Sequence, residues 1–169
     1  MPVRDVDAFS GMLPRGVTVT ANRGVNGIDG IVATAAGHAR GWRDGPAALL
    51  IGDLAFLHDL GSLRAARSTP LTVVVINNGG GHIFDFLPIA AHRPVFEEFF
   101  LTPQHANLDE ICGGLGIEHR RVTSLAGLQR QFQRSISEAG FEVLEVQIPG
   151  ENNRECHERF HQAVVERVS

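Results

Sequence analysis

The sequence predicts an α/β protein, a three-layer sandwich in which helices cover a mostly parallel central sheet. Two continuous apolar runs, residues 46–53 and 71–78, have the composition of strands buried on both faces of a parallel sheet. Segments with apolar residues at helical spacing lie between the expected strands, and this alternation is typical of parallel sheets. Ligands of such sheets bind beyond the carboxyl ends of the strands, so we expect functional residues there.

The elements expected along the chain follow this alternation. Strands are expected at residues 17–21, 46–53, 71–78, 118–122 and 141–148. Helical patterns begin near Ile28, after Asp53 and after Ser124, which is a candidate N-cap. Residues 79–106 interrupt the alternation with three glycines, three prolines and a phenylalanine cluster. A segment of this length without regular structure is usually functional or mobile.

Composition narrows the class of protein. A chain of 169 residues, 43% hydrophobic and 20% charged, is long enough to bury one core, so we expect a single domain over residues 1–169. A net charge of −4 gives no reason to expect nucleic-acid binding. No apolar run approaches the roughly 20 residues that cross a bilayer, and no signal peptide is recognisable, so we expect a soluble, cytoplasmic protein. Cys112 and Cys156 lack the spacing of a zinc site and are expected to be reduced, structural thiols.

Oxygen ligands end both apolar runs. Asp53 ends the first and Asn78 ends the second, so neighbouring parallel strands would hold them at one edge of the sheet. Mg²⁺ prefers oxygen ligands, and a carboxylate, an amide, a backbone carbonyl, a diphosphate and water would complete its shell. Glycines 79–81 let the backbone approach a phosphate, and the helices that follow would direct their N-termini at the anion. Each motif alone also has a structural interpretation, because such an Asp is often a helix cap and Asn-Asn-Gly-Gly is often a turn.

The loop at residues 21–30 is expected at the same edge of the sheet. Arg23 would bind a carboxylate bidentately, or it would pair with Asp29 as a solvated loop residue. Ile28 is either exposed near the site or the first apolar residue of the following helix face, and the pattern favours the second interpretation.

The GDL segment at residues 52–54 and the NNGGG segment at residues 77–81 resemble the GDG…N motif of the thiamine-diphosphate-dependent enzymes. Within that class the chain resembles the 2-succinyl-5-enolpyruvyl-6-hydroxy-3-cyclohexene-1-carboxylate synthase (MenD) family of menaquinone biosynthesis in five motifs that occur in order: MPVRDVDAF, NRGVNGIDGIVATAAG, IGDLAFLHDLGSL, PLTVVVINNGGGHIFDFLP and FEEFFLTP. It matches only the C-terminal diphosphate-binding domain, and Leu54 stands where many members of the class carry glycine. The resemblance implies the thiamine-diphosphate-binding fold, and a longer enzyme whose pyrimidine-binding and central domains are missing here.

The resemblance also implies roles for individual residues. The ligands of Mg²⁺, with Mn²⁺ as an alternative metal, would be the side chains of Asp53 and Asn78 and the carbonyl of Gly80. The residues lining thiamine diphosphate would be Leu54, Ala55, Asn78, Gly80, Gly81, His82, Ile83 and Phe84. The catalytic set would be an apolar wedge under the cofactor, Ile28, and two arginines that bind substrate carboxylates, Arg4 and Arg23.

The implied activity is that of a transferase, which decarboxylates 2-oxoglutarate and adds the resulting carbanion to isochorismate. The glutamate that activates the cofactor would come from the pyrimidine-binding domain of a partner subunit. We therefore expect a homo-oligomer, an exposed apolar patch where the missing domains dock, and an isolated chain that is inactive. The alternatives are a non-catalytic α/β module that binds a phosphorylated ligand, and a flavin- or nucleotide-binding domain. The absence of G-x-G-x-x-G after the first expected strand and of a Walker lysine weakens the nucleotide-binding alternative.

Overall fold

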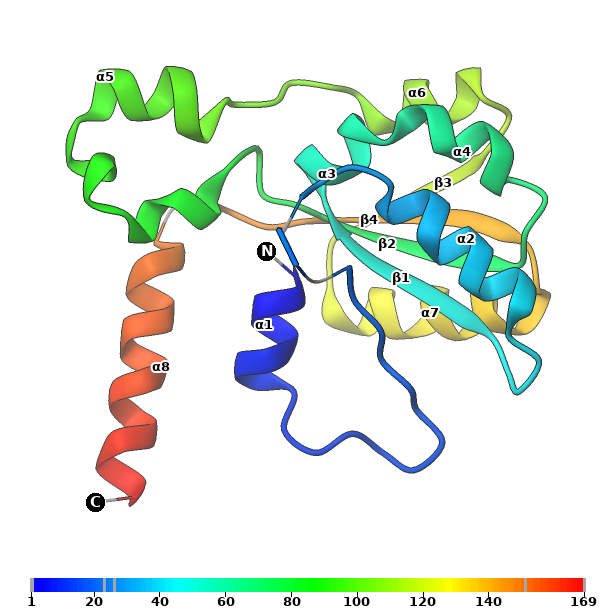
Figure 1. Ribbon diagram of the computed structural model, residues 1–169, viewed down its shortest axis with the longest axis horizontal. Coiled ribbons are helices and arrows are strands. Elements are labelled where there is room, and N and C mark those ends of the chain that lie inside the picture. Colours follow the sequence, from blue (N-terminus) through cyan, green and yellow to red (C-terminus); the bar gives the residue numbers. More distant parts are fainter. Residues whose placement is uncertain (1, 23, 26, 151, 169) are drawn as a thin grey trace. The chain divides into compact units, whose positions relative to one another are not determined.

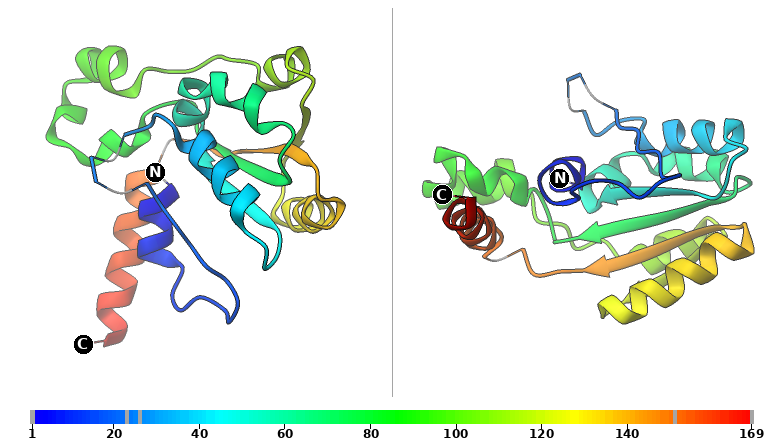
Figure 2. Two further views of the ribbon diagram at one scale, coloured as in Figure 1. Left: turned by 45° about the vertical axis from the view of Figure 1, so that its right-hand side comes forward. Right: turned by 90° about the horizontal axis from the view of Figure 1, so that it is seen from below.

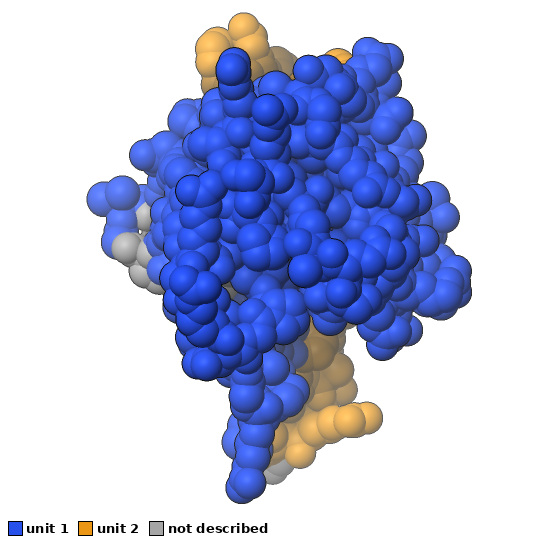
Figure 3. Space-filling model, turned by 90° about the vertical axis from the view of Figure 1, so that its right-hand side faces the viewer, with its two compact units in different colours: residues 1–77, 106–147 blue, residues 78–105, 148–169 orange. Residues whose placement is uncertain are grey.

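The computed structural model describes residues 2–22, 24–25, 27–150 and 152–168 and groups the chain into two compact units. Unit 1 is drawn from residues 1–77 and 106–147, and unit 2 from residues 78–105 and 148–169 (Figure 3). That the whole chain acts as one domain stays a prediction. In the described part of the chain, every helix is too short or too polar to cross a membrane.

Unit 1 is built on a four-stranded parallel sheet. Its strands pair in the order β1 (Ala47–Gly52), β2 (Leu71–Asn77), β4 (Phe141–Gln147) and β3 (Glu118–Val122). The register aligns Gly52 with Ile76 and Asn77 with Gln147. The carboxyl ends of β1, β2 and β4 therefore lie at one edge of the sheet, which confirms that the two apolar runs are neighbouring parallel strands.

Helices cover both faces of this sheet and confirm the expected three layers. One face carries α2 (Ile31–Gly41), α3 (Asp53–His58), α4 (Leu60–Ala66) and α6 (Leu108–Gly114), and the other carries α7 (Leu125–Glu138). Side chains alternate along each strand, so Val73 and Val143 pack under the first group while Val74 and Leu144 face α7. Figure 2 shows α7 on the opposite side of the sheet from α2. Unit 1 also contains α1 (Pro2–Phe9), labelled in Figure 1.

Unit 2 consists of short helical turns followed by one long helix. Its elements are η1 (His82–Phe86), η2 (Pro88–Ala91), α5 (Arg93–Phe96), η3 (Glu97–Leu101) and α8 (Asn153–Val168). Of the expected phenylalanine cluster, Phe96 is fully buried and its ring stacks on that of Phe100, with 6.4 Å between centroids, whereas Phe99 is 65% exposed. The ring of Phe84 meets Phe100 edge-on at 5.7 Å. Residues 79–106 thus contain more regular structure than their composition predicts.

The expected strand at residues 17–21 is wrong. These residues form no strand, and Val17 and Val19 are about half exposed. Alternating valine and threonine satisfies strand propensity, but a strand is stable only where a neighbouring strand completes its hydrogen bonds. The helix expected from Ile28 starts three residues later, because α2 begins at Ile31.

A carboxylate from elsewhere in the chain stabilises the start of α2. Gly30 precedes this helix with a φ of 67° and provides no side-chain cap. Asp59, buried between α3 and α4, instead accepts hydrogen bonds from the N–H groups of Val32 at 2.6 Å and Ala33 at 3.4 Å. Its other oxygen accepts from the Ser62 hydroxyl at 2.6 Å. Asp59 therefore satisfies donors that a helix N-terminus leaves open.

Replacing Asp59 with alanine is expected to lower the free energy of unfolding by about 2 kcal/mol, because buried N–H groups lose their acceptor. Urea denaturation measures this loss. Asp44→Ala removes an exposed loop carboxylate and serves as the matched control, with an expected change below about 0.5 kcal/mol. Equal losses in the two variants would contradict the capping role of Asp59.

Candidate functional site

Asp53 lies at the carboxyl edge of the sheet, where β1 passes directly into α3. Only 4% of its surface is exposed, and its Oδ1 accepts the N–H of Leu54 at 2.8 Å. Leu54 and Ala55 complete the first turn of α3, and Ala55 is buried in the core beneath. A carboxylate is costly to bury unless it is paired or binds a cation. This position therefore suits a ligand of a hard cation.

The neighbouring strand brings Asn77 to the same edge. Gly52 lies opposite Ile76 in the register of β1 and β2. Asp53 and Asn77, the next residues along each chain segment, therefore lie at neighbouring positions at this edge. The Nδ2 of Asn77 donates to the Oε1 of Glu145 at 2.7 Å. Of the two consecutive asparagines, Asn77 is thus tied to the sheet of unit 1.

Glu145 is the centre of a buried polar cluster on β4. Its exposed fraction is 1%, and its Oε2 lies 3.1 Å from the Nε2 of His119 and 3.3 Å from the Nε of Arg121. The His119 contact is as short as an ion pair but lacks hydrogen-bond geometry. The Nδ1 of His119 lies 3.2 Å from the Oδ1 of Asp109. A hollow of about 280 Å³, lined by Asn107, Asp109, His119 and Arg121, lies beside this cluster.

Close packing within unit 2 explains two of the three consecutive glycines. The N–H of Gly81 donates to the carbonyl of Leu101 at 2.6 Å, and a Cβ on Gly81 would collide with the carbonyl oxygen of Phe100. Gly80 has a φ of 146°, and a Cβ there would collide with the carbonyl oxygen of Leu101. These positions need glycine for the packing of the loop itself, in addition to any approach by a phosphate.

Backbone donors predicted to line a diphosphate have acceptors within unit 2. The N–H of Gly81 donates to Leu101, that of His82 to Gly80 at 3.0 Å, and that of Phe84 to Gly81 at 3.0 Å. These donors stabilise the turn η1 in the conformation described. Phosphate contacts through the same N–H groups therefore require η1 to rearrange.

The side chain of His82 is held inside unit 2. Its Nδ1 lies 2.7 Å from the Oδ2 of Asp85, and its ring fills the space that a Cβ on Gly150 would need. Ile83 follows it in η1 and is half-buried. The structure therefore gathers Gly80 and Gly81, together with the η1 residues, in one loop of unit 2, whereas Asp53, Leu54 and Ala55 belong to unit 1. Asn78 is the first residue of unit 2 and is half-buried.

The residues predicted to be catalytic lie in unit 1 or outside the described residues. Arg4 is exposed on α1. Ile28 lies in the loop before α2 and is 39% exposed, so it does not begin the apolar face of that helix. Arg23 lies outside the described residues. The roles of all three in substrate or cofactor binding stay predictions.

The described residues contain no group of three or more His, Cys, Asp or Glu side chains that would hold a metal ion. The predicted magnesium site has a different composition, with one carboxylate, one amide oxygen and one backbone carbonyl. Oxygen donors of this kind suit Mg²⁺, which usually takes few ligands from the protein and shares phosphate oxygens with its substrate or cofactor. The donor set of Asp53, Asn78 and Gly80 therefore fits the group.

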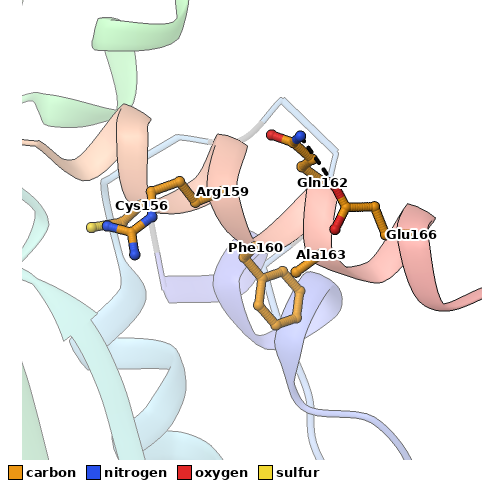
Figure 4. A pocket seen from close by; sticks show the side chains of 6 residues that line it. All are labelled: Cys156, Arg159, Phe160, Gln162, Ala163 and Glu166. Carbon is orange, nitrogen blue, oxygen red and sulfur yellow. Dashed lines mark hydrogen bonds between the residues drawn. The ribbon is translucent and has the colours of Figure 1, made fainter.

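A second hollow has none of the predicted site residues in its lining. This hollow lies along α8 and has a volume of about 540 Å³. Figure 4 shows the side chains that line it, which are those of Cys156, Arg159, Phe160, Gln162, Ala163 and Glu166. All of them come from a single helix, whereas ligand pockets usually gather polar groups from several elements in a concave site. We assign this groove no function.

Sequence reasoning missed the buried acids Glu145 and Asp59. A signal for Glu145 was present, because it interrupts an apolar strand on the same face as Val143, and a carboxylate buried in a sheet needs partners. The sequence around Asp59 indicates only a residue on a helix surface. Its bonds to the start of α2 cross 27 residues of sequence, so no local pattern indicates them.

The two cysteines differ in environment. Cys112 is fully buried in α6. The pKa of its thiol is raised to about 11, mainly by burial and to a smaller extent by the negative charges of Asp109 and Glu145. Cys156 is exposed on α8. Because the thiolate is the reactive form, a thiol reagent at about pH 8 is expected to label native protein at Cys156 alone. Cys156→Ser should abolish this labelling and Cys112→Ser should preserve it. Rapid labelling of the folded Cys156→Ser variant would contradict the assignment.

Comparisons with known proteins place this geometry among characterised folds. Residues 11–146 match the family described as "Thiamine pyrophosphate enzyme, C-terminal TPP binding domain". Three relatives are each named 2-succinyl-5-enolpyruvyl-6-hydroxy-3-cyclohexene-1-carboxylate synthase. That of Rubrobacter xylanophilus is 45% identical over 93% of this chain and 27% of its own length. Those of Prosthecochloris aestuarii and Bacillus velezensis are 40% and 38% identical, each over 99% of this chain and 29% of the relative.

The chain thus spans less than a third of the length of these relatives. Among solved structures, benzoylformate decarboxylase from Polynucleobacter necessarius matches with a TM-score of 0.60. The match has 20% sequence identity and covers 73% of this chain and 23% of that chain. At this identity the likeness supports the fold alone.

Proposed function

Since the chain belongs to the thiamine pyrophosphate enzyme family and matches its C-terminal TPP-binding domain, we propose that it holds the cofactor's diphosphate through a magnesium ion at the carboxyl edge of the sheet. The observation that carries this proposal is the position of Asp53, a buried carboxylate that follows β1 beside the end of β2. Asp53 and Asn78 would provide side-chain oxygens and Gly80 a carbonyl, with Mn²⁺ as an alternative metal.

Other residues would surround the cofactor. Leu54 and Ala55 in the first turn of α3, and the segment from Gly80 to Phe84, would line the diphosphate. Ile28 would support the cofactor as an apolar wedge, and its 39% exposure ahead of α2 leaves its side chain accessible for such a contact. Binding would include a rearrangement of η1, because the N–H groups of Gly81 and His82 are engaged within the loop.

The names of the relatives suggest the reaction of the whole enzyme. We propose that the enzyme of which this chain would be the C-terminal domain decarboxylates 2-oxoglutarate and joins the product to isochorismate in menaquinone biosynthesis. Thiamine diphosphate, when bound, supplies the electron sink for the carbanion left by loss of carbon dioxide. Arg4 and Arg23 would hold substrate carboxylates, because a guanidinium binds a carboxylate bidentately.

Turnover is proposed to need a pyrimidine-binding domain from a partner subunit, which supplies the activating glutamate. The active enzyme would therefore be a homo-oligomer. Unit 2 exposes several large apolar side chains, a feature common at protein interfaces: Phe84, Phe86, Leu87, Val95 and Phe99. This exposed apolar surface is an argument for the proposal that further domains dock on unit 2.

The isolated chain is expected to form no product from 2-oxoglutarate and isochorismate, even with saturating thiamine diphosphate and Mg²⁺. Product formation followed by NMR tests this. The full-length Rubrobacter xylanophilus relative serves as the positive control. A chain that turns over at the rate of that relative would contradict the requirement for a partner domain.

A further inference from the structure

We propose that Glu145 is a positioning residue for the metal site. It holds the Asn77 side chain and so anchors the end of β2, from which the segment with Asn78 and Gly80 departs. The inference rests on the proposed function, because it takes Asn78 and Gly80 as metal ligands. Glu145 itself would contact neither metal nor cofactor.

The contacts of Glu145 connect three strands. Its position on β4 pairs with Val75 in the register of the sheet, and Asn77 reaches it diagonally on the same face with an N···O distance of 2.7 Å. The second oxygen of Glu145 lies beside His119 and Arg121 of β3. Because the carboxylate is 1% exposed and contacts side chains of both neighbouring strands, its position is defined by the sheet.

An anchor at the end of β2 matters because glycines follow it, and glycine restricts the direction of the backbone less than any other residue does. Asn77 is the last residue of the strand, and Gly79 and Gly80 follow with φ angles of 81° and 146°. Glycine loses more conformational entropy on ordering than any other residue. A side-chain hydrogen bond at the last strand residue limits the directions in which the chain leaves the sheet. Partners that orient ligands without touching the metal commonly change metal affinity when they are removed.

Glu142 provides a matched control on the same strand. It is also buried, and its carboxylate forms ion pairs with Arg120 and Arg134. Its position on β4 lies opposite Thr72 in the register of the sheet, and its side chain faces α7. Removing Glu142 therefore costs a buried ion pair without releasing Asn77. A general loss of stability affects both glutamate variants, whereas loss of positioning affects Glu145 alone.

The test compares Glu145→Leu, Glu142→Leu and Asn77→Asp. Asn77→Asp keeps the side-chain size but sets a second carboxylate against Glu145, so it disrupts the same contact if Glu145→Leu fails to fold. Three quantities are measured: hydrogen exchange of the backbone amides of residues 78–84 without cofactor, the Kd for thiamine diphosphate with Mg²⁺, and the thermal midpoint.

Glu145→Leu and Asn77→Asp are expected to speed exchange over residues 78–84 and to raise the Kd about tenfold, in line with other residues that orient metal ligands. Glu142→Leu should leave both quantities unchanged, whatever its thermal midpoint. Unchanged exchange and affinity in folded Glu145→Leu and Asn77→Asp, beside a wild type that binds, would overturn the inference alone. So would equal effects from Glu142→Leu. A folded wild-type chain that does not bind the cofactor would overturn the proposed function and, with it, the positioning role.

Discussion

Replacement of Asp53 by alanine is expected to weaken magnesium-dependent binding of thiamine diphosphate by about 100-fold or more. Loss of a residue that merely orients a metal ligand commonly costs 10–100-fold in metal affinity, and Asp53 is proposed to be a ligand itself. It is also the one carboxylate in the proposed ligand set, so its removal takes away the negative charge that the protein would offer the cation. Calorimetric titration of thiamine diphosphate into the variant, with and without Mg²⁺, measures the loss.

Two further variants separate charge from shape. Asp53→Asn keeps an oxygen in place but removes the charge, and it should bind more weakly than wild type and more tightly than Asp53→Ala. Asp44→Ala removes an exposed carboxylate that precedes β1, whereas Asp53 follows the other end of that strand, and this variant should bind like wild type. A folded Asp53→Ala variant with wild-type affinity would exclude Asp53 as a metal ligand.

Replacement of Phe56 by alanine is expected to lower the free energy of unfolding by about 4 kcal/mol, as is usual when a buried aromatic ring is deleted and leaves a cavity. Phe56 has no exposed surface and lies in the core under α2 and α4, in the same helix as Asp53. Total stabilities of domains are only about 5–15 kcal/mol, so the variant would be close to unfolding. Urea denaturation followed by circular dichroism measures the change.

The same substitution at an exposed position is the control. Phe99 is 65% exposed in η3, and Phe99→Ala is expected to cost less than about 1 kcal/mol, as is usual for surface changes. Similar losses of unfolding free energy in Phe56→Ala and Phe99→Ala would contradict the placement of Phe56 in the core. Cofactor affinity of the folded fraction should fall little in Phe56→Ala, in contrast to Asp53→Ala.

The positions of the strands were predictable from local sequence, but the expected burial of residues 46–53 on both faces is wrong, because β1 is an edge strand and Leu50 is 44% exposed. The runs that became β1, β2 and β4 were located to within a residue at each end, and β3 coincides with the expected 118–122. Ser124 caps α7 as expected, its Oγ accepting the N–H of Gly127 at 3.1 Å. In these elements burial and capping leave a direct pattern in the residues themselves. Residues 17–21 carry a similar pattern, but strand formation there depends on a distant neighbour that the pattern does not include.

The features of the site that could not be predicted from the sequence are those that depend on contacts between distant residues. The edge position of Asp53 followed from the parallel sheet and is confirmed by the register. The partner of Asn77 is Glu145, 68 residues away, and the crowding at Gly81 comes from Phe100. No pattern of periodicity connects residues so far apart. The sequence offered two interpretations of the glycine loop, a phosphate-binding feature or a turn, and neither included the packing requirement that its glycines meet.

The most direct test of the central claim is calorimetric titration of thiamine diphosphate into the wild-type chain, in the presence and absence of Mg²⁺. Circular dichroism and a cooperative unfolding transition establish that the protein is folded. The account predicts saturable binding, with one site per chain, that requires the metal. Absence of binding to the folded chain, or binding of equal affinity without Mg²⁺, would contradict a magnesium-diphosphate site at the carboxyl edge of this sheet.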